Sequence, residues 1–438
     1  MTGSNTAPSR SFTRYALPVD DTIKQQMLNW GNQFNICCFM DNHGYQAGAH
    51  SYECLLAAGS WRWVKLRAGS GLDLLQAFAA HAGDWLFGHL GFGLQQDCVG
   101  VSNRFDDAVG FPDGYFFVPE HLLLLTAGEL SISSYSLPPD QVLRQVMASR
   151  GAGPRQTEAP TFAATYPRDE YIRLVKALQA HIQRGDCYEI NFCQAFTAQG
   201  VQMDPVQVYR DLCRLSPTPF SVYYKLDDSY CLCASPERYF RLANRRVWSE
   251  PIKGTAARDP DPAIDQALAT RLRNDPKEQA ENVMIVDLVR NDLSRVCQPG
   301  SVQVEELFGV YPFPRVHQMI STVTGLLKAG LGWTDVVAAS FPMGSMTGAP
   351  KKRVLELIGQ YERRGRGLFS GSIGYVDPGG HADFNVVIRS LQYHRATGYL
   401  EYLVGSGITG YADAAHEYEE CLLKAAAIRS VWASAAQS

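Results

Sequence analysis

Residues 248–255, Trp248-Ser249-Glu250-Pro251-Ile252-Lys253-Gly254-Thr255, read as an extended segment that ends in a turn. Pro251 restricts the backbone before Ile252, and Gly254 lets the main chain approach a ligand closely. Lys253 is therefore expected at the end of a stiff strand. Taken alone, the stretch is compatible with a nucleophilic lysine and with a solvated turn lysine.

Glu237 stands sixteen residues before Lys253, counted as 253 minus 237. That distance suits two neighbouring strands joined through Asn244-Arg245-Arg246, with both side chains near one end of a sheet. A carboxyl and an amine so placed can serve as acid and nucleophile, or form a simple ion pair. Strand-like and helix-like segments interleave around them without βαβ regularity, which predicts an α+β fold.

The composition indicates a soluble globular protein without nucleic acid or membrane as its main partner. The chain has 438 residues, 46% of them hydrophobic and 19% charged, with a net charge of −4. The sequence contains no run of about 18 apolar residues of the kind that spans a membrane. The eleven cysteines show no paired CxxC spacing, so free thiols and a cytoplasmic location are expected.

One stretch with little hydrophobic pattern is expected to divide the chain into two regions. Residues 149–166 are rich in Gly, Pro and Thr and lack a hydrophobic period, which predicts a linker. It separates residues 1–148 from residues 167–438, although the two regions are expected to form one intertwined unit. Within the second region, residues 276–296 and 415–432 predict long helices, and residues 383–391 predict a strand.

Two pairs of glutamates stand three residues apart in those predicted helices. They are Glu278 with Glu281, and Glu417 with Glu420. At 3.6 residues per turn each pair occupies one face of its helix. If the faces meet, the carboxylates surround a point that needs a cation, and all-oxygen ligation suits Mg²⁺. Two solvated acidic faces are the alternative interpretation.

Other polar groups stand at the ends of apolar segments. His317 follows a proline-rich stretch and could be a catalyst or a hydrogen-bonded core histidine. Residues 344–351 form a glycine-rich turn that opens a helix and offers amides to an anion. Arg389 ends a strand, where it could clamp a carboxylate or lie on the surface. With the amides of residues 405–407, these groups suit a small anionic substrate.

Five segments in order along the chain resemble motifs of the chorismate-utilising enzymes. They are Ser235-Pro236-Glu237, Pro251-Ile252-Lys253-Gly254-Thr255, residues 278–295, Gly348-Ala349-Pro350-Lys351 and Gly405-Ser406-Gly407. The resemblance covers residues 166–432, and residues 1–147 are similar to the more variable N-terminal part of the family. It implies two large, mainly antiparallel β-sheets packed as a sandwich with helices outside.

Position 253 separates the branches of this family. Its lysine is similar to the branch that aminates chorismate at C4, whereas anthranilate synthases usually have alanine there. Isochorismate and salicylate synthases use a lysine near residues 188–191, where this chain has Glu189 and no lysine. The resemblance therefore implies an Mg²⁺-dependent transferase that makes 4-amino-4-deoxychorismate for para-aminobenzoate and folate. Anthranilate formation and a non-catalytic chorismate-binding relative are the alternatives.

The resemblance also implies a role for each site residue. Lys253 adds to ring carbon C2 of chorismate while the C4 hydroxyl leaves, and Glu237 donates a proton to that hydroxyl. Because free lysine is protonated at neutral pH, the site must lower its pKa or a neighbouring base must take its proton. The remaining implied roles are direct Mg²⁺ binding by Glu281 and Glu420, Mg²⁺ binding through water by Glu278 and Glu417, catalysis near the ring by His317, and substrate contact by Gly254, Thr255, Ser345, Phe369, Arg389, Gly405, Ser406, Gly407 and Lys424.

The sequence departs from the family pattern at three of these places. Glu189 stands where glutamine is frequent, Asn282 stands where histidine is common, and Phe369 replaces a tyrosine or tryptophan. No glutaminase domain is apparent after the last motif. A separate glutamine amidotransferase subunit is therefore expected to supply the ammonia.

Overall fold

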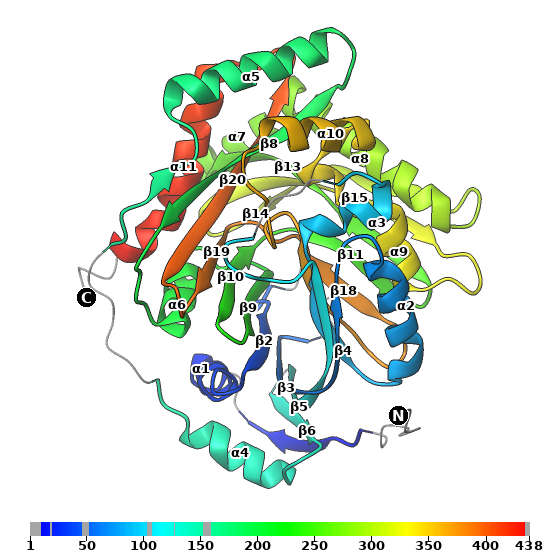
Figure 1. Ribbon diagram of the computed structural model, residues 1–438, viewed down its shortest axis with the longest axis vertical. Coiled ribbons are helices and arrows are strands. Elements are labelled where there is room, and N and C mark those ends of the chain that lie inside the picture. Colours follow the sequence, from blue (N-terminus) through cyan, green and yellow to red (C-terminus); the bar gives the residue numbers. More distant parts are fainter. Residues whose placement is uncertain are drawn as a thin grey trace.

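The computed structural model describes residues 10–17, 20–45, 52–102, 107–126, 128–151 and 159–433. Its helices, which lie outside the strands in Figure 1, are α1 (Asp21–Gly31), α2 (Gly71–Ala82), α3 (Gln95–Val99), α4 (Pro139–Ala148), α5 (Arg168–Gln183), α6 (Pro205–Leu215), α7 (Pro262–Arg273), α8 (Pro276–Val296), α9 (Trp333–Ser340), α10 (Lys351–Tyr361) and α11 (Ala414–Ala433), with short 3-10 turns η1 (Phe92–Leu94) and η2 (Gly344–Met346).

The strands of these described residues form one antiparallel hydrogen-bonded network. They are β1 (Thr13–Ala16), β2 (Ile36–Asp41), β3 (Cys54–Leu66), β4 (Leu86–Leu90), β5 (Gly114–Thr126), β6 (Glu129–Ser134), β7 (Ala163–Ala164), β8 (Glu189–Ala198), β9 (Phe220–Leu226), β10 (Ser229–Ser235), β11 (Arg238–Ala243), β12 (Arg246–Glu250), β13 (Ile252–Ala257), β14 (Gln303–Pro312), β15 (Val316–Leu326), β16 (Gly348–Ala349), β17 (Ser372–Val376), β18 (Ala382–Asn385), β19 (Ser390–His394) and β20 (Tyr399–Thr409).

The network has two arms, which are joined where the long strands β3 and β5 pair with each other. One arm runs β3–β2–β9–β10–β19–β20–β8. The other runs β5–β4–β17–β18–β11–β12–β15, with β13 and β14 also paired to β15. The last strand of the first arm in the sequence is β20, and the last strand of the second arm is β18. Each lies between two strands that precede it in the sequence.

The two arms pack face to face, and helices cover their outer faces. The interior cluster combines Cys38 and Tyr224 of the first arm with Phe87 and Ile373 of the second. On the outer face of the first arm, α5 and α11 pack over β8 and β20, whereas α2, α8 and α9 cover the second arm (Figure 1). The predicted α+β sandwich is confirmed in this form.

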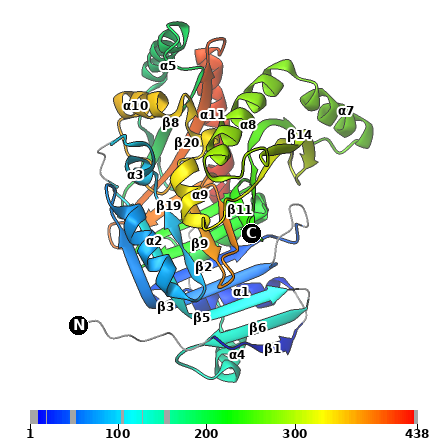
Figure 2. The ribbon, with the colours of Figure 1, turned by 90° about the vertical axis from the view of Figure 1, so that its right-hand side faces the viewer.

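The N-terminal strands lie at one end of the molecule, and α5, α7 and α11 lie at the other (Figure 2). Both arms contain strands from residues 1–148 and from residues 167–433. The described part of the chain thus places the two predicted regions within shared sheets. The division at residues 149–166 remains a prediction, because residues 152–158 lie outside the described residues.

Several predicted elements differ from the structure in detail. The turn predicted after Lys253 is wrong, because β13 continues to Ala257. Gly254 sits instead at a register shift between β13 and β15, with a φ of +95° that favours glycine. The predicted strand 383–391 is two strands, β18 and β19, separated by a bend that contains Arg389 with a φ of +50°. The long helices at 276–296 and 415–432 are confirmed.

Candidate active site

Lys253 points from β13 toward the β8–β20 edge of the other arm. Its Nζ donates a hydrogen bond to Oε1 of Glu189 at 2.5 Å, and Oε2 of Glu281 lies 4.0 Å from the same nitrogen. The Glu189 side chain is 2% exposed and the Lys253 side chain 13% exposed. The structure therefore brings together three residues that lie 28 to 92 positions apart in the sequence.

Gly407 provides the space for this contact. It pairs with Asn191 across the β20–β8 ladder. A Cβ atom at position 407 would lie 2.8 Å from Glu189 Oε1 and 2.9 Å from Lys253 Nζ. Any side chain here would displace the ion pair, so the glycine is needed for close packing as well as for a free amide.

Burial and charge act in opposite directions on the Lys253 amine. Burial lowers the pKa of Lys253, but the carboxylates of Glu189 and Glu281 outweigh it and raise the pKa above its ordinary value. The first of the two sequence expectations, a depressed pKa, is therefore not met. The second, a neighbouring base, is met by Glu189, whose other oxygen Oε2 is buried without a hydrogen-bond partner among the described residues.

Glu237 lies at the entry to β11, within the electrostatic reach of Lys253. Burial raises the pKa of Glu237 to about 7, against opposing effects of Ser345 and Lys253. A carboxyl group with this pKa holds a proton near neutral pH and can donate it. The predicted hairpin between Glu237 and Lys253 is confirmed, because β11 and β12 pair around residues 244 and 245.

Arg389 is a half-buried cation whose charge acts on Glu237. Burial lowers the pKa of Arg389, and the Glu237 carboxyl partly opposes this effect. Its guanidinium makes no hydrogen bond or ion pair to any other described residue, although its backbone carbonyl accepts a bond from Ala234 at 3.1 Å. A half-buried guanidinium with no partner among the described residues is suited to a substrate carboxylate.

The paired glutamates approach one another from α8 and α11. Burial raises the pKa of Glu281 to about 7 and also raises the pKa of Glu278, and the charge of Glu420 contributes to the shift at Glu278. The geometry groups Glu417 and Glu420 with His416, with ligand atoms within 4.8 Å of one another. Clustered carboxylates, of which Glu278 and Glu281 have raised pKa values, fit a hard cation such as Mg²⁺, and His416 is a neighbour that the sequence did not indicate.

Residues 405–407 and Lys424 connect this acidic group to β20. The Ser406 hydroxyl donates to Oε2 of the buried Glu417. Lys424 Nζ contacts Glu420 Oε1 at 2.7 Å and donates to the Gly405 carbonyl at 3.0 Å. Burial raises the pKa of Glu420, but the charges of Lys424, Lys277 and His416 and the Lys424 hydrogen bond together outweigh it and lower the pKa. The structure therefore brings Lys424 and residues 405–407 to the helix face that carries Glu417 and Glu420.

His317 occupies β15 next to a residue that the sequence did not indicate. Its Nε2 lies 2.8 Å from Oδ1 of Asp265, and its Nδ1 is buried without a partner among the described residues. Arg258 donates to both oxygens of Asp265 at 2.8 and 2.9 Å. Asp265 belongs to α7, whose capping sequence at Asp261-Pro262 was the available signal for a helix there.

The remaining predicted contacts are placed less closely. Gly254 lies against Glu278, whose Oε2 would be 3.0 Å from an added Cβ. Ser345 is buried in η2, whereas Thr255 is exposed. Phe369 is 2% exposed and belongs to the apolar cluster beneath the second arm. Substrate contact by Thr255 and Phe369 stays a prediction.

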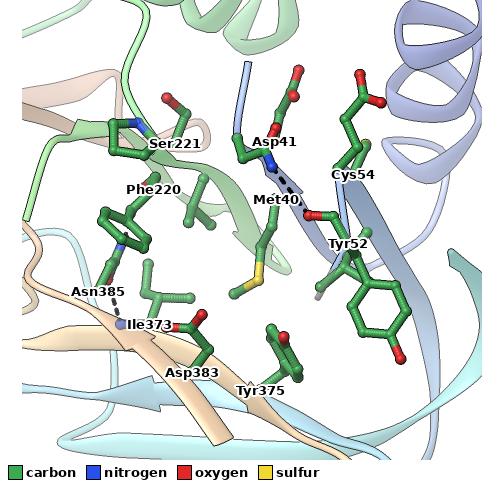
Figure 3. A pocket seen from close by; sticks show the side chains of 15 residues that line it. Met40, Asp41, Tyr52, Cys54, Phe220, Ser221, Ile373, Tyr375, Asp383 and Asn385 are labelled. Atoms are coloured by element: carbon green, nitrogen blue, oxygen red, sulfur yellow. Dashed lines mark hydrogen bonds between the residues drawn. The ribbon is translucent and has the colours of Figure 1, made fainter. Parts of the chain in front are cut away.

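A separate small cavity lies between the two arms (Figure 3). Its volume is about 50 Å³, and its lining includes Met40, Tyr52, Phe220, Tyr375 and Asp383. The Asn42 side chain donates to the Tyr52 carbonyl, and Asn385 accepts a hydrogen bond from the Ile373 amide, which Figure 3 shows. No predicted site residue lines it, so this cavity is distinct from the Lys253 site.

Comparison with protein families gives a match to the chorismate binding enzyme model over residues 46–430. Aminodeoxychorismate synthase component 1 of Klebsiella aerogenes is 38% identical over 335 residues, which cover 76% of this chain and 74% of that protein. The Salmonella typhimurium protein of the same name is 43% identical over 253 residues, covering 58% of this chain and 55% of that protein. The second alignment thus spans about half the length of its relative.

Among solved structures, anthranilate synthase component I from Streptococcus pneumoniae TIGR4 is similar with a TM-score of 0.76 and 26% identity. The match covers 88% of this chain and 94% of that chain. No helix among the described residues is long and apolar enough to cross a membrane.

Proposed function

We propose that this chain, which belongs to the family of chorismate binding enzymes, acts as an aminodeoxychorismate synthase component I. It would convert chorismate and ammonia to 4-amino-4-deoxychorismate, a precursor of para-aminobenzoate and folate. The observation that carries the proposal is the buried contact between Lys253 and Glu189, 2.5 Å long, beside the buried acid Glu237. The similarity to proteins named aminodeoxychorismate synthase component 1 supports the same branch.

The first step would join Lys253 to the substrate. Glu189 accepts a proton from Nζ, the freed electron pair forms a bond to ring carbon C2, and both ring double bonds shift, to C1=C6 and C4=C5, as the C4–O bond breaks. Glu237 gives its proton to the departing oxygen, so that water leaves. The pKa of about 7 at Glu237 keeps this proton available near neutral pH.

The second step would release the lysine. Ammonia attacks C4, both double bonds shift back, and the N–C2 bond breaks with its electron pair returning to Lys253. The proton lost by the incoming nitrogen restores the starting charge of the site. The enolpyruvyl group stays on the ring throughout, which distinguishes this product from anthranilate.

The acidic residues and Arg389 would hold the substrate in place. Glu281 and Glu420 would bind Mg²⁺ directly and Glu278 and Glu417 through water, and the ion would bind the ring carboxylate. Arg389 would bind a second carboxylate bidentately, because its guanidinium is half-buried and has no partner among the described residues. Gly407 and Lys424 would line the remaining surface.

A separate glutamine amidotransferase subunit would supply ammonia to this site. The relatives named component 1 support a partner component. The chain alone is then expected to use ammonium salts and to be inactive with glutamine.

The test is turnover of chorismate by the purified chain with Mg²⁺ and ammonium, followed by mass analysis of the product. Wild type should form an amino product that retains the enolpyruvyl group. Lys253→Ala should lose at least about 10³-fold of this rate, since the covalent route is removed, and Lys176→Ala on the exposed face of α5 should lose none. Anthranilate and pyruvate as the wild-type products would favour an anthranilate synthase, and no turnover would favour a binding protein.

A further inference from the structure

Arg366 is a buried arginine behind the candidate site, in the segment that follows α10. Its side chain is 1% exposed, and that of its partner Glu362 is 3% exposed. All five N–H donors of the guanidinium are used. They bond to Glu362 Oε2 at 3.0 Å and Oε1 at 2.6 Å, the Met346 carbonyl at 2.7 Å, the Asn191 carbonyl at 2.7 Å and the Ser370 hydroxyl at 3.2 Å.

These bonds join three segments that are distant in the sequence. Asn191 lies in β8, two residues after Glu189. Met346 lies in η2, directly after Ser345, and Ser370 directly follows Phe369. Ser345 and Phe369, two predicted site residues, therefore lie immediately beside contacts with the guanidinium, and Glu189, the partner of Lys253, lies two residues from the third contact.

Two further bonds reinforce the same connection. Glu362 Oε1 accepts the backbone N–H of Cys193 at 3.0 Å, which attaches the carboxylate to β8. Asn191 Nδ2 donates to the Ser345 carbonyl at 2.9 Å, which attaches β8 to η2 directly. None of these contacts involves Lys253, Glu237 or Arg389, so Arg366 supports the site from behind.

The charged pair Arg366 and Glu362 has a property that apolar side chains at the same buried place would lack. A buried ion pair gains little net stability over apolar residues of similar size, because both charges lose their hydration. A guanidinium, however, fixes five acceptors in one rigid plane, which apolar side chains cannot do. The geometry thus favours a role in placing the three segments over a role in stability alone.

We propose that Arg366 and Glu362 are positioning residues that hold Glu189, and through it Lys253, in register with the Ser345 turn. The inference rests on the proposed function, in which Lys253 must meet ring carbon C2. A misplacement of about 1 Å in such a contact can lower a rate by about 10²-fold.

The test replaces both charges together, in Arg366→Met/Glu362→Leu, so that no lone buried charge remains. The melting temperature should stay within a few degrees of wild type and KM for chorismate within about threefold. The kcat should fall by about 10²-fold, because binding groups such as Arg389 are intact while the reacting nitrogen is misplaced. The matched control is Arg10→Met/Asp84→Leu, another buried pair of 2.9 Å in the N-terminal region, which should keep its kcat.

A folded double variant with kcat within threefold of wild type would overturn the positioning role. Should the double variant fail to fold, Glu362→Gln provides the second measurement, since it keeps the side-chain shape but weakens two bonds to Arg366. Its kcat should fall by about tenfold with little change in KM, and an unchanged kcat would equally overturn the inference. Wild type is the reference in each assay: absence of its amino product would refute the proposed function, whereas active wild type with an equally active double variant refutes only the positioning role.

Discussion

Glu237 is a buried carboxyl group whose pKa of about 7 lies well above its ordinary value of 4.5. As the proposed proton donor it is active only while protonated. We therefore expect kcat for the amino product to fall as pH rises through about 7. Glu237→Gln, which carries no titrating proton, should lose most activity, and its residual rate should lack that limb of the pH profile. A wild-type rate that is flat from pH 6 to 9 would contradict this role.

The raised pKa of Glu237 also makes the free energy of unfolding depend on pH. The folded state holds the Glu237 proton up to about pH 7, whereas the unfolded state releases it near 4.5. Glu237 therefore lowers the free energy of unfolding progressively as pH rises between these values, by at most about 3 kcal/mol. The loss is complete above pH 7, and it is absent from the Gln variant.

At the level of single residues, the sequence predicted which residues act in the site better than it predicted which residues contact one another. The motif around Lys253 indicated a nucleophile, and the spacing to Glu237 indicated a hairpin. Glu189 was noticed only as a departure from the family, because its contact with Lys253 is made between β8 and β13. Arg366 gave no signal, since its partners come from three distant segments, and Asp265 gave none of its own, since its partner His317 lies 52 residues away.

The two glutamate-bearing helices, α8 and α11, give the prediction that belongs to whole elements. Mg²⁺ bound between them should raise the melting temperature, because a ligand that binds only the folded state stabilises it. Glu281→Gln/Glu420→Gln should abolish most of this increase, measured by a thermal scan with and without Mg²⁺ in the absence of chorismate.

Glu419→Gln is the matched control, because Glu419 is exposed on α11 and faces Arg168 at 3.7 Å. It should keep the full Mg²⁺ effect. An equal increase in the double variant would show that these carboxylates do not form the metal site.

Among the elements, periodicity identified the helices with a strong pattern or clear boundaries. Periodicity missed α7 because Leu272 is the buried residue of this helix, which therefore has little apolar pattern. Residues 383–391 were predicted as a single strand because Val386 and Val387, in the bend between β18 and β19, are themselves apolar and buried. A period of two cannot reveal a bend whose residues are themselves buried.

Across the whole molecule, the eleven cysteines are free thiols, as the sequence predicted, and ten are buried. Burial raises the pKa of Cys37 and of Cys233 to about 12, so the reactive thiolate is scarce. A thiol reagent should therefore modify at most one cysteine rapidly in the native chain, namely the partly exposed Cys98.

After denaturation without reductant, all eleven should react, and mass spectrometry counts them. Fewer than eleven would indicate disulfides, and several fast reactions before denaturation would contradict the buried arrangement. The overall pairing of strands, by contrast, lay beyond periodicity, because hydrogen bonds between β4 and β17 join residues nearly 290 positions apart.

The late position of β18 and β20 in the chain bears on how the protein is made. Each joins the strand made just before it to one that leaves the ribosome much earlier, β11 or β8, so neither arm can close until nearly the whole polypeptide has emerged. At about 5–20 residues per second, the first strands wait tens of seconds with open edges. Nascent chains of this protein should therefore depend on chaperones during translation, and synthesis halted before residue 399 should yield an aggregating product rather than a folded N-terminal half.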